Sequence, residues 1–343
     1  MTTFHFLYTT DHNYFPHMLT SMYSLAESNK NNNIKIHVIE DGFTKEDFYK
    51  LDQFNDLYDN ISIKKYNINI ISGLIRHFDI PKWRNTDIAN VRLFSSEIID
   101  ETDKILYLDS DTMVINDLKD LFHKKIQKPL AAVKEIVIPT HVNSLECEYY
   151  GVKIESYYNS GVLLFDYNAW SQEDCLGSLY YITREMHDKL IYPDQDLINL
   201  AFQDQIETLD LSYNIIPLAK DLEKHKLLAR KFLRDKSVCY NYDDLAASLS
   251  NPHIIHALHY FNTSVWEKNR VHPFTKEYEN YRRLWDENYE PQKLKKSIIY
   301  NMPIISDLNI MSKTILKDES HRKIKQKILK KEWWKTHSFI NSK

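Results

Sequence analysis

KILYLDSDTMVINDL, residues 104–118, passes from an apolar run into two acidic residues and back into apolar ones. The run at 105–108 is typical of a buried strand. Asp109 and Asp111 follow it at once, with Ser110 between them. Because burying a carboxylate is costly without a compensating partner, the two acids must either reach solvent at a turn or share a cation.

Strand and helix patterns alternate on both sides of this segment. The spacing of apolar residues predicts strands at 4–9, 35–42, 61–68, 131–138 and 157–166, and helices at 18–28, 44–54, 117–122 and 192–202. Residues 87–100 favour a further helix that carries Arg92, and residues 252–261 a strand or loop with three histidines. This alternation predicts an α/β fold with a mostly parallel central sheet. Ligands of such sheets bind at the carboxyl ends of the strands, where the two acids lie.

The composition excludes several classes of protein. A chain of 343 residues with 43% hydrophobic residues can bury a sizeable core, and a formal net charge of −4 argues against nucleic-acid binding. No apolar segment reaches the roughly 18 residues of a membrane span, and the first residues do not resemble a signal peptide. Cys147, Cys175 and Cys239 are too scattered for a zinc site or a disulfide framework, so we expect a reducing, cytoplasmic setting.

The acid pair supports more than one chemistry. Two carboxylates on a turn after a strand form a hard oxygen site that favours Mg²⁺ or Mn²⁺. An ordinary turn is the plain alternative, because Asp is common in turns. A phosphohydrolase of the haloacid-dehalogenase type, with Asp109 as nucleophile, is a second alternative. Its motif stands near the start of the domain and continues as Gly-Thr, whereas three strands precede this one and Thr112-Met113 follows it.

Several motifs, in order over most of residues 4–285, resemble glycosyltransferase family 8, a family of retaining enzymes with the GT-A fold. The matching segments are FLYTTDHNYFPHMLTSMYSL, ANVRLFSSEII, KILYLDSDTMVINDLKDLF, AAVKE, YYNSGVLLFD, YPDQDLIN and IIHALHYFNTSVWEKNRVHPF. The resemblance implies a GT-A nucleotide-sugar-binding domain at 1–285, followed by a basic, helical extension at 286–343.

Residue roles follow from the same resemblance. Contacts to the nucleotide and its phosphates fall on Asp11, Asn13, Tyr14, Arg92, Asp109, Ser110, Asp111 and Lys268. The metal ligands fall on Asp109, Asp111 and His256. The catalytic candidates around the sugar fall on Glu135, Asn159, Asp194 and Gln195, with Ser160 and Gly161 beside Asn159.

The last motif departs from the family pattern. The family shows a histidine, a glycine three residues later and then Lys-Pro-Trp, whereas this chain lacks the glycine and has Ser264-Val265-Trp266. Lys268 is therefore only a substitute for the phosphate-binding lysine. His259 is the alternative to His256 as third ligand, and Trp83 and Trp266 are candidates for stacking on a sugar face.

The resemblance implies transfer of a hexose from UDP-glucose or UDP-galactose to a glycan, glycoprotein or glycolipid, with Mn²⁺ or Mg²⁺. A divalent cation and Arg92 would offset the charge that grows on the departing UDP. Retention fits either an enzyme nucleophile or a same-face return, and Gln195 would be a poor nucleophile. A non-catalytic nucleotide-sugar-binding protein is a further alternative.

The C-terminal composition differs from the rest. Residues 292–343 hold 13 Lys and Arg against 4 Asp and Glu, together with the pair Trp333-Trp334. Such a segment suits either an anionic membrane surface, for example the inner face of the plasma membrane, or packing as a helical extension. The oligomeric state stays open, and the Asn-, Lys- and Ile-rich composition suggests a bacterial source.

Overall fold

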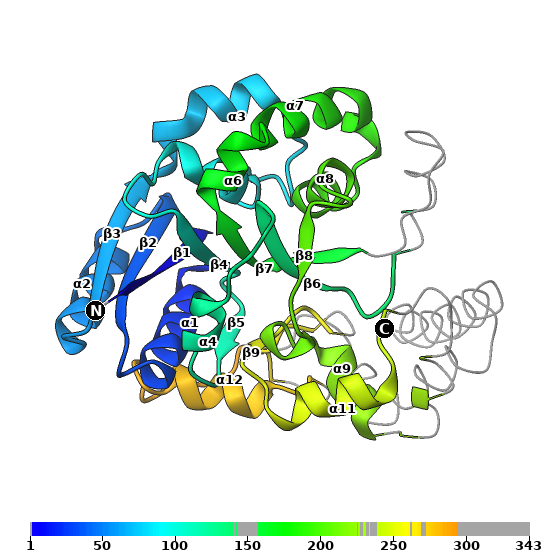
Figure 1. The fold of residues 1–343 in the computed structure, drawn as a ribbon. Helices are drawn as coiled ribbons and strands as arrows, with labels where there is room; N and C mark the ends of the chain where they lie inside the picture. Colours follow the sequence, from blue (N-terminus) through cyan, green and yellow to red (C-terminus); the bar gives the residue numbers. More distant parts are fainter. Residues whose placement is uncertain are drawn as a thin grey trace, which may run out of the picture.

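The computed structural model describes residues 2–139, 142, 157–224, 226, 229–230, 233, 239–260, 263–268 and 272–293. A twisted central sheet lies between two layers of helices (Figure 1). The predicted helical extension lies outside the described residues from residue 294 onward, as does Cys147. Cys175 and Cys239 are free thiols. None of the described helices is long and apolar enough to cross a membrane.

The central sheet has seven strands in the order β3-β2-β1-β4-β7-β6-β8. They are β1 (Thr3–Asp11), β2 (Asn33–Asp41), β3 (Ile61–Asn67), β4 (Lys104–Leu108), β6 (Leu130–Lys134), β7 (Tyr158–Asp166) and β8 (Ile206–Thr208). Only β7 runs antiparallel to its neighbours, β4 and β6. The predicted α/β fold with a mostly parallel sheet is confirmed.

The first two crossover helices match the sequence pattern. Helix α2 (Lys45–Leu57), predicted at 44–54, is capped by Thr44, which forms a capping box with Asp47. Helix α1 (Phe15–Ser28) begins three residues before the predicted start, because Pro16 fits the first turn of a helix. Both helices return the chain to the start of the next parallel strand, so the loops after β1, β2 and β4 share one edge of the sheet.

A second, two-stranded sheet pairs β5 (Thr112–Val114) with β9 (Ile254–His256) in antiparallel fashion. Strand β5 follows the acid pair directly, and Thr112 lies opposite His256. Residues 252–261, predicted as a strand or loop, thus contain a strand of three residues. Its importance is positional, because it carries a histidine from late in the chain to the end of β4.

Two predicted elements differ from the structure. Residues 87–100 do not form an α-helix; they contain the 3₁₀ helix η2 (Asn90–Glu97), in which Arg92 Nε donates to the carbonyl of Ala89, 2.7 Å away. The strand predicted at 131–138 ends at Lys134, which pairs with Tyr158, the first residue of β7, after a register shift between Ala132 and Lys134. Glu135 therefore leaves the sheet and can face the ligand edge.

The remaining helices complete the two layers. They are α3 (Ser72–Phe78), α4 (Lys119–His123), α6 (Tyr167–Gln172), α7 (Cys175–Met186), α8 (Pro193–Ala201), α9 (Pro217–Lys224), α11 (Tyr242–Ser250) and α12 (Thr275–Arg282), with the 3₁₀ helices η1 (Ile68–Ile71), η3 (His187–Lys189) and η4 (Leu211–Tyr213). Helices α3, α6, α7 and α8 cover one face of the sheet, and α1, α4 and α12 the other (Figure 1).

Strand β4 shows how these layers position the site. Leu106 and Leu108 pack into the core on the α1 side, and Ile105 and Tyr107 into the core on the α7 side. Side chains alternate between the two faces of a strand, so both faces of β4 are buried as far as Leu108. Asp109 is the first residue after this buried run. The apolar run therefore anchors the acid pair at the carboxyl edge of the sheet.

Candidate active site

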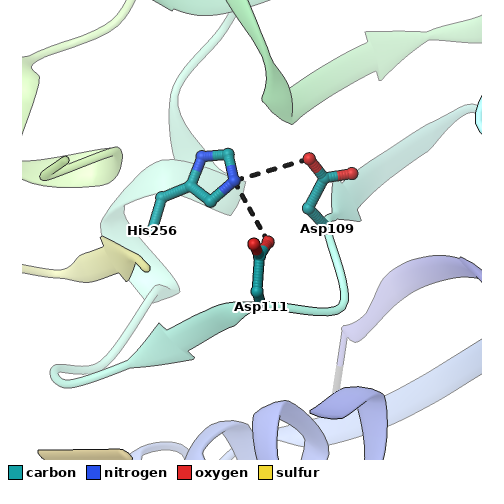
Figure 2. Close-up of side chains that lie close together, drawn as sticks. All are labelled: Asp109, Asp111 and His256. Atoms are coloured by element: carbon teal, nitrogen blue, oxygen red, sulfur yellow. Dashed lines mark ion pairs between the residues drawn. The ribbon is translucent and has the colours of Figure 1, made fainter. Parts of the chain in front are cut away.

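Three side chains predicted as metal ligands lie together at this edge. Asp109, Asp111 and His256 each offer one ligand atom within 4.8 Å of the others (Figure 2). Nε2 of His256 lies 3.2 Å from Oδ1 of Asp111 and 3.5 Å from Oδ2 of Asp109. Carboxylate oxygens and imidazole nitrogen form a donor set that suits a divalent metal ion.

Backbone hydrogen bonds hold the cluster in place. The N–H of Asp109 donates to the carbonyl of Gly161 on β7, 2.8 Å away. The hydroxyl of Thr112 donates to the carbonyl of Asp109, also at 2.8 Å. The N–H of Ala257, just after β9, donates to the carbonyl of Asp111 at 2.9 Å. The acid pair is thus tied to both sheets, so the three ligands come from rigid elements.

The electrostatics of His256 indicate a site for a cation. Burial alone would lower its pKa, but Asp111 and Asp109 raise the pKa of His256 to about 10. Nε2 is buried, and within the described part of the chain its neighbours are these two carboxylates, with no well-aligned hydrogen bond. A buried imidazole nitrogen that faces two carboxylates fits a metal ligand. His259, the alternative ligand, lies elsewhere, with Nε2 at 3.5 Å from the Ser264 hydroxyl.

Arg92 balances the acids from the other side. Its guanidinium is buried, lies 3.0 Å from Oδ1 of Asp109 and 3.6 Å from Oδ2 of Asp194, and covers the ring of Tyr107 at 4.2 Å. Burial raises the pKa of Asp109, but Arg92 and His256 outweigh it and hold that pKa well below its usual range. Asp109 is therefore ionised and available as a ligand.

The predicted sugar-side residues surround the start of β7. Nδ2 of Asn159 donates to Oε1 of Glu135 at 2.7 Å, and Oε1 of Gln195 accepts from the N–H of Ser160 at 2.9 Å. Burial raises the pKa of Glu135. Burial and then Asp109 raise the pKa of Asp194, against Arg92, which lowers it. Helix α8 supplies Asp194 and Gln195 from its first turn.

A separate pocket lies at the ends of β1 and β2. Its volume is about 350 Å³, and its lining residues are Asp11, His12, Asn13, Asp41, Gly42, Lys82, Asn85, Thr86 and Asp87. Asp11 and Asn13, two of the predicted contacts to the nucleotide and its phosphates, are therefore in its wall. Tyr14, which follows them in the sequence, accepts a hydrogen bond from Arg84 at 3.0 Å. The many carboxylate oxygens make this pocket a good acceptor of ligand hydroxyl and N–H groups.

Three further residues predicted to contact phosphate or sugar lie in different surroundings. Lys268 is exposed, and its backbone N–H donates to the carbonyl of Gln292, 2.8 Å away. Trp266 is buried and stacks on His17 at 3.6 Å, which leaves little ring surface for a sugar. Trp83 lies edge-on to Tyr192 at 5.6 Å, near the first turn of α8.

Sequence reasoning missed two residues of the site. The hydroxyl of Tyr107 donates to Oδ1 of Asp109 at 2.5 Å, and Oδ1 of Asn214 lies 3.0 Å from Nδ1 of His256. Tyr107 lies within an apolar strand and carries no local signal of function. Asn214 stands alone in LSYNII, distant in sequence from every motif. The backbone pairing of Ile215 with β9 is what places Asn214 beside His256.

Comparison with known sequences agrees with this geometry. The sequence model of glycosyltransferase family 8 matches residues 5–256. Glycosyltransferase GlyA of Streptococcus pneumoniae is 29% identical over 221 residues, which cover 63% of this chain and 28% of that protein. A lipopolysaccharide 1,2-glucosyltransferase of Escherichia coli is 28% identical over 250 residues, covering 70% of this chain and 71% of that protein. The chain matches only 27% to 49% of the length of three streptococcal relatives.

Solved structures share the fold. The galactosyltransferase LgtC, solved with donor and acceptor sugar analogues, has a TM-score of 0.63 at 18% identity, covering 81% of this chain and 95% of that chain. GlyE of Streptococcus pneumoniae has a TM-score of 0.57 at 22% identity, covering 84% and 62%. At this level of identity the likeness concerns the GT-A fold alone. Since the family match spans well over half of the sequence, the chain belongs to glycosyltransferase family 8.

Proposed function

We propose that this protein is a metal-dependent, retaining α-glycosyltransferase that moves a hexose from UDP-glucose or UDP-galactose to a carbohydrate acceptor. The observation that carries the proposal is the convergence of Asp109, Asp111 and His256 at the sheet edge, beside Arg92 and the first turn of α8. The E. coli relative named as a lipopolysaccharide 1,2-glucosyltransferase supports a hexose donor and a glycolipid or glycan acceptor.

The donor would lie along this edge. The acidic pocket at Asp11 and Asn13 accepts hydrogen bonds from the ribose hydroxyls and the base, with Tyr14 beside it. The diphosphate then reaches the cluster at the end of β4. Ser110, between the two acids, donates its hydroxyl to Thr10 at 3.0 Å and so braces the turn over which the diphosphate passes.

Charge governs the chemical step. A divalent cation held by Asp109, Asp111 and His256 would supply positive charge to the diphosphate as it leaves. Arg92 keeps Asp109 ionised and its own charge buried within the site. Because these groups are fixed before the reaction, no reorganisation opposes the build-up of charge on the departing UDP.

The sugar would lie between α8 and the start of β7. Asn159, Glu135 and Asp194 offer polar groups to its hydroxyls. Gln195 is held by the N–H of Ser160, so its amide oxygen is oriented and polar but weakly nucleophilic. We therefore favour a mechanism in which the acceptor attacks the anomeric carbon from the same face that UDP leaves, so that the configuration is retained. Asp194 and Gln195 would stabilise the positive charge on that carbon. Trp83 would line the acceptor side.

The two alternatives predict different reactions. A phosphohydrolase would use Asp109 as nucleophile, but the oxygens of Asp109 face Tyr107, Arg92 and His256, and family 8 membership argues against it. A non-catalytic protein would bind UDP without turnover. Lys268 is assigned to the phosphates from its place in the sequence, and its side chain is exposed.

The proposed division of the chain into two parts rests on their difference in composition. We assign residues 1–285 to the catalytic domain and residues 286–343 to a basic extension that contacts anionic membrane. A cytoplasmic enzyme that is peripheral on the inner face of the plasma membrane would meet lipid-linked acceptors there.

The deciding experiment measures UDP release from UDP-glucose and UDP-galactose with Mn²⁺, with Mg²⁺ and with EDTA. We expect release that requires the metal and falls at least about 100-fold in Asp111→Asn, since that change removes a charged ligand. Phosphate release from simple phosphomonoesters would favour the phosphohydrolase. UDP binding without any turnover on either donor would favour the non-catalytic alternative.

A further inference from the structure

A buried amide links the metal cluster to the sugar side. Oδ1 of Asn214 lies 3.0 Å from Nδ1 of His256, and Nδ2 of Asn214 donates to Oδ1 of Asn159 at 2.8 Å. Asn159 in turn donates to Glu135 at 2.7 Å. His256, Asn214 and Asn159 are each at most 4% exposed, so water does not compete for these bonds. The four side chains form one continuous hydrogen-bonded chain.

One backbone group fixes which atom donates and which accepts in each of these hydrogen bonds. The N–H of Gly161 donates to Oδ1 of Asn159 at 2.9 Å, and a backbone N–H cannot accept. Oδ1 of Asn159 therefore faces Gly161 and Asn214, and its amide nitrogen faces Glu135. Asn214 must then present its own nitrogen to Asn159 and its oxygen to His256. That oxygen can only accept, so Nδ1 of His256 carries a hydrogen.

The consequence is a defined state of the imidazole. Because Nδ1 keeps its hydrogen, Nε2 is the nitrogen that offers a lone pair when a cation replaces its proton, and Nε2 is the atom that faces Asp109 and Asp111. The backbone around Asn214 is also fixed. The N–H of Ile215 donates to Ile254 at 2.9 Å, and that of His256 donates to Ile215 at 2.9 Å. The amide is thus rigidly attached to the strand that carries the ligand.

We propose that Asn214 is a positioning residue, which sets His256 for metal binding with one end of its amide and orients Asn159 and Glu135 toward the donor sugar with the other. The proposal rests on the proposed function and names a residue outside its ligand sets. It predicts that metal and donor bind cooperatively, because ordering either end of the chain of bonds favours the geometry needed at the other.

Two substitutions distinguish the hydrogen bond of Asn214 to His256 from its hydrogen bond to Asn159. Asn214→Leu removes both bonds, and we expect the affinity for Mn²⁺ alone, measured by calorimetry without donor, to fall roughly 10- to 100-fold. Asn214→Asp keeps an acceptor for His256 but loses the donor to Asn159. Its affinity for Mn²⁺ should stay within about threefold of that of the unsubstituted protein, because carboxylates serve as well in this role.

The second part of the test measures the kinetics of UDP release from the sugar nucleotide. At saturating Mn²⁺, Asn214→Asp should raise the KM for UDP release roughly tenfold or lower kcat by a similar factor, since Asn159 then faces an acceptor with its own oxygen. The cooperativity between Mn²⁺ and UDP-sugar, measured as the change in Mn²⁺ affinity on adding donor, should decrease in both variants, and the part that arises from direct attraction between the cation and the diphosphate should remain.

Asn29→Leu is the matched control. Asn29 is as buried as Asn214, donates to Leu25 at 3.2 Å and accepts from Leu118 at 3.0 Å, away from the metal cluster. Its loss should lower thermal stability without changing Mn²⁺ affinity. Unchanged Mn²⁺ affinity in Asn214→Leu, or an equal loss in Asn214→Asp and Asn214→Leu, would overturn the positioning role. If the unsubstituted protein binds Mn²⁺ but releases no UDP, the proposed function fails while the metal test of Asn214 still stands.

Discussion

Gly161 shows how closely one position of β7 approaches the metal cluster. A Cβ atom added there would lie 2.0 Å from Cε1 of His256 and 2.8 Å from Oδ2 of Asp109. His256 cannot yield freely, because its ring is bonded to Asn214. We predict that Gly161→Ala lowers Mn²⁺ affinity at least tenfold and costs about 1–3 kcal/mol of stability through overpacking. Calorimetric Mn²⁺ titration and urea unfolding measure the two effects.

Gly73 provides the comparison within the same protein. It lies in α3, and a Cβ atom there would meet no atom within 4 Å. Gly73→Ala should leave Mn²⁺ affinity unchanged and raise stability by a few tenths to about 1 kcal/mol, because it reduces the entropy of the unfolded chain. Similar Mn²⁺ affinities in the two alanine variants would show that Gly161 is not needed for close approach to the ligands.

At the scale of single residues, the sequence predicts groups whose signal is local. Asp109 and Asp111 stand together after a strand, and the structure brings them to a common ligand position. His256 could be named only beside His259, because one-dimensional spacing does not tell which ring turns toward β4. Asn214 carries no local signal, since its role depends on a bond to a residue 42 positions away. Its discovery needs the fold.

At the scale of elements, β1 and β2 carry a buried pair of histidines. Nδ1 of His5 lies 3.0 Å from Nε2 of His37, whose Nδ1 lies 3.1 Å from the hydroxyl of Tyr66. Glu101, at 3.8 Å, is the acidic neighbour of His37. Burial and the charge of His5, with smaller contributions from Lys35 and Lys64, outweigh Glu101 and lower the pKa of His37 to about 4. Burial also lowers the pKa of His5.

These lowered pKa values predict a loss of stability in acid. Between about pH 6.5 and pH 4 the unfolded chain binds more protons at His37 than the folded protein does, so stability falls as pH falls. We expect His37→Gln to reduce the difference in unfolding free energy between pH 7 and pH 5 by on the order of 2 kcal/mol. Urea unfolding at pH 7, 6 and 5 measures the slope. The exposed His123→Gln is the control, and equal slopes in all three proteins would contradict the argument.

At the scale of elements, hydrophobic periodicity predicts some helices and strands and misses others. The strands β1, β2 and β3 and the helix α2 were predictable because apolar spacing and a capping box are local properties. The pairing of β5 with β9 was not, because a three-residue strand gives almost no periodic signal and its partner lies more than 100 residues away. The 3₁₀ form of η2 was also missed, since residues 87–100 have helical spacing but bond at shorter range around Arg92.

At the scale of the whole molecule, charge is divided unevenly along the chain. Residues 292–343 carry a net +9 in a chain whose total is −4, so residues 1–291 carry −13. An acidic body resists anionic membrane, whereas each Lys or Arg near such a surface contributes about 1 kcal/mol. The division between a catalytic domain and a basic extension therefore has a consequence that can be measured without knowing the acceptor.

We predict that the full chain sediments with vesicles containing phosphatidylserine and not with neutral phosphatidylcholine vesicles. Replacing Lys323, Lys325 and Lys327 by Gln should weaken this binding by up to roughly 100-fold, since three positive charges are lost. Replacing the exposed Lys45, Lys119 and Lys125 by Gln changes the net charge equally and should have little effect. Binding should also weaken in 1 M salt, where the screening length falls to about 3 Å. If both triple variants bind equally, the basic extension does not act as the membrane contact, and packing against the protein becomes the better account of residues 286–343.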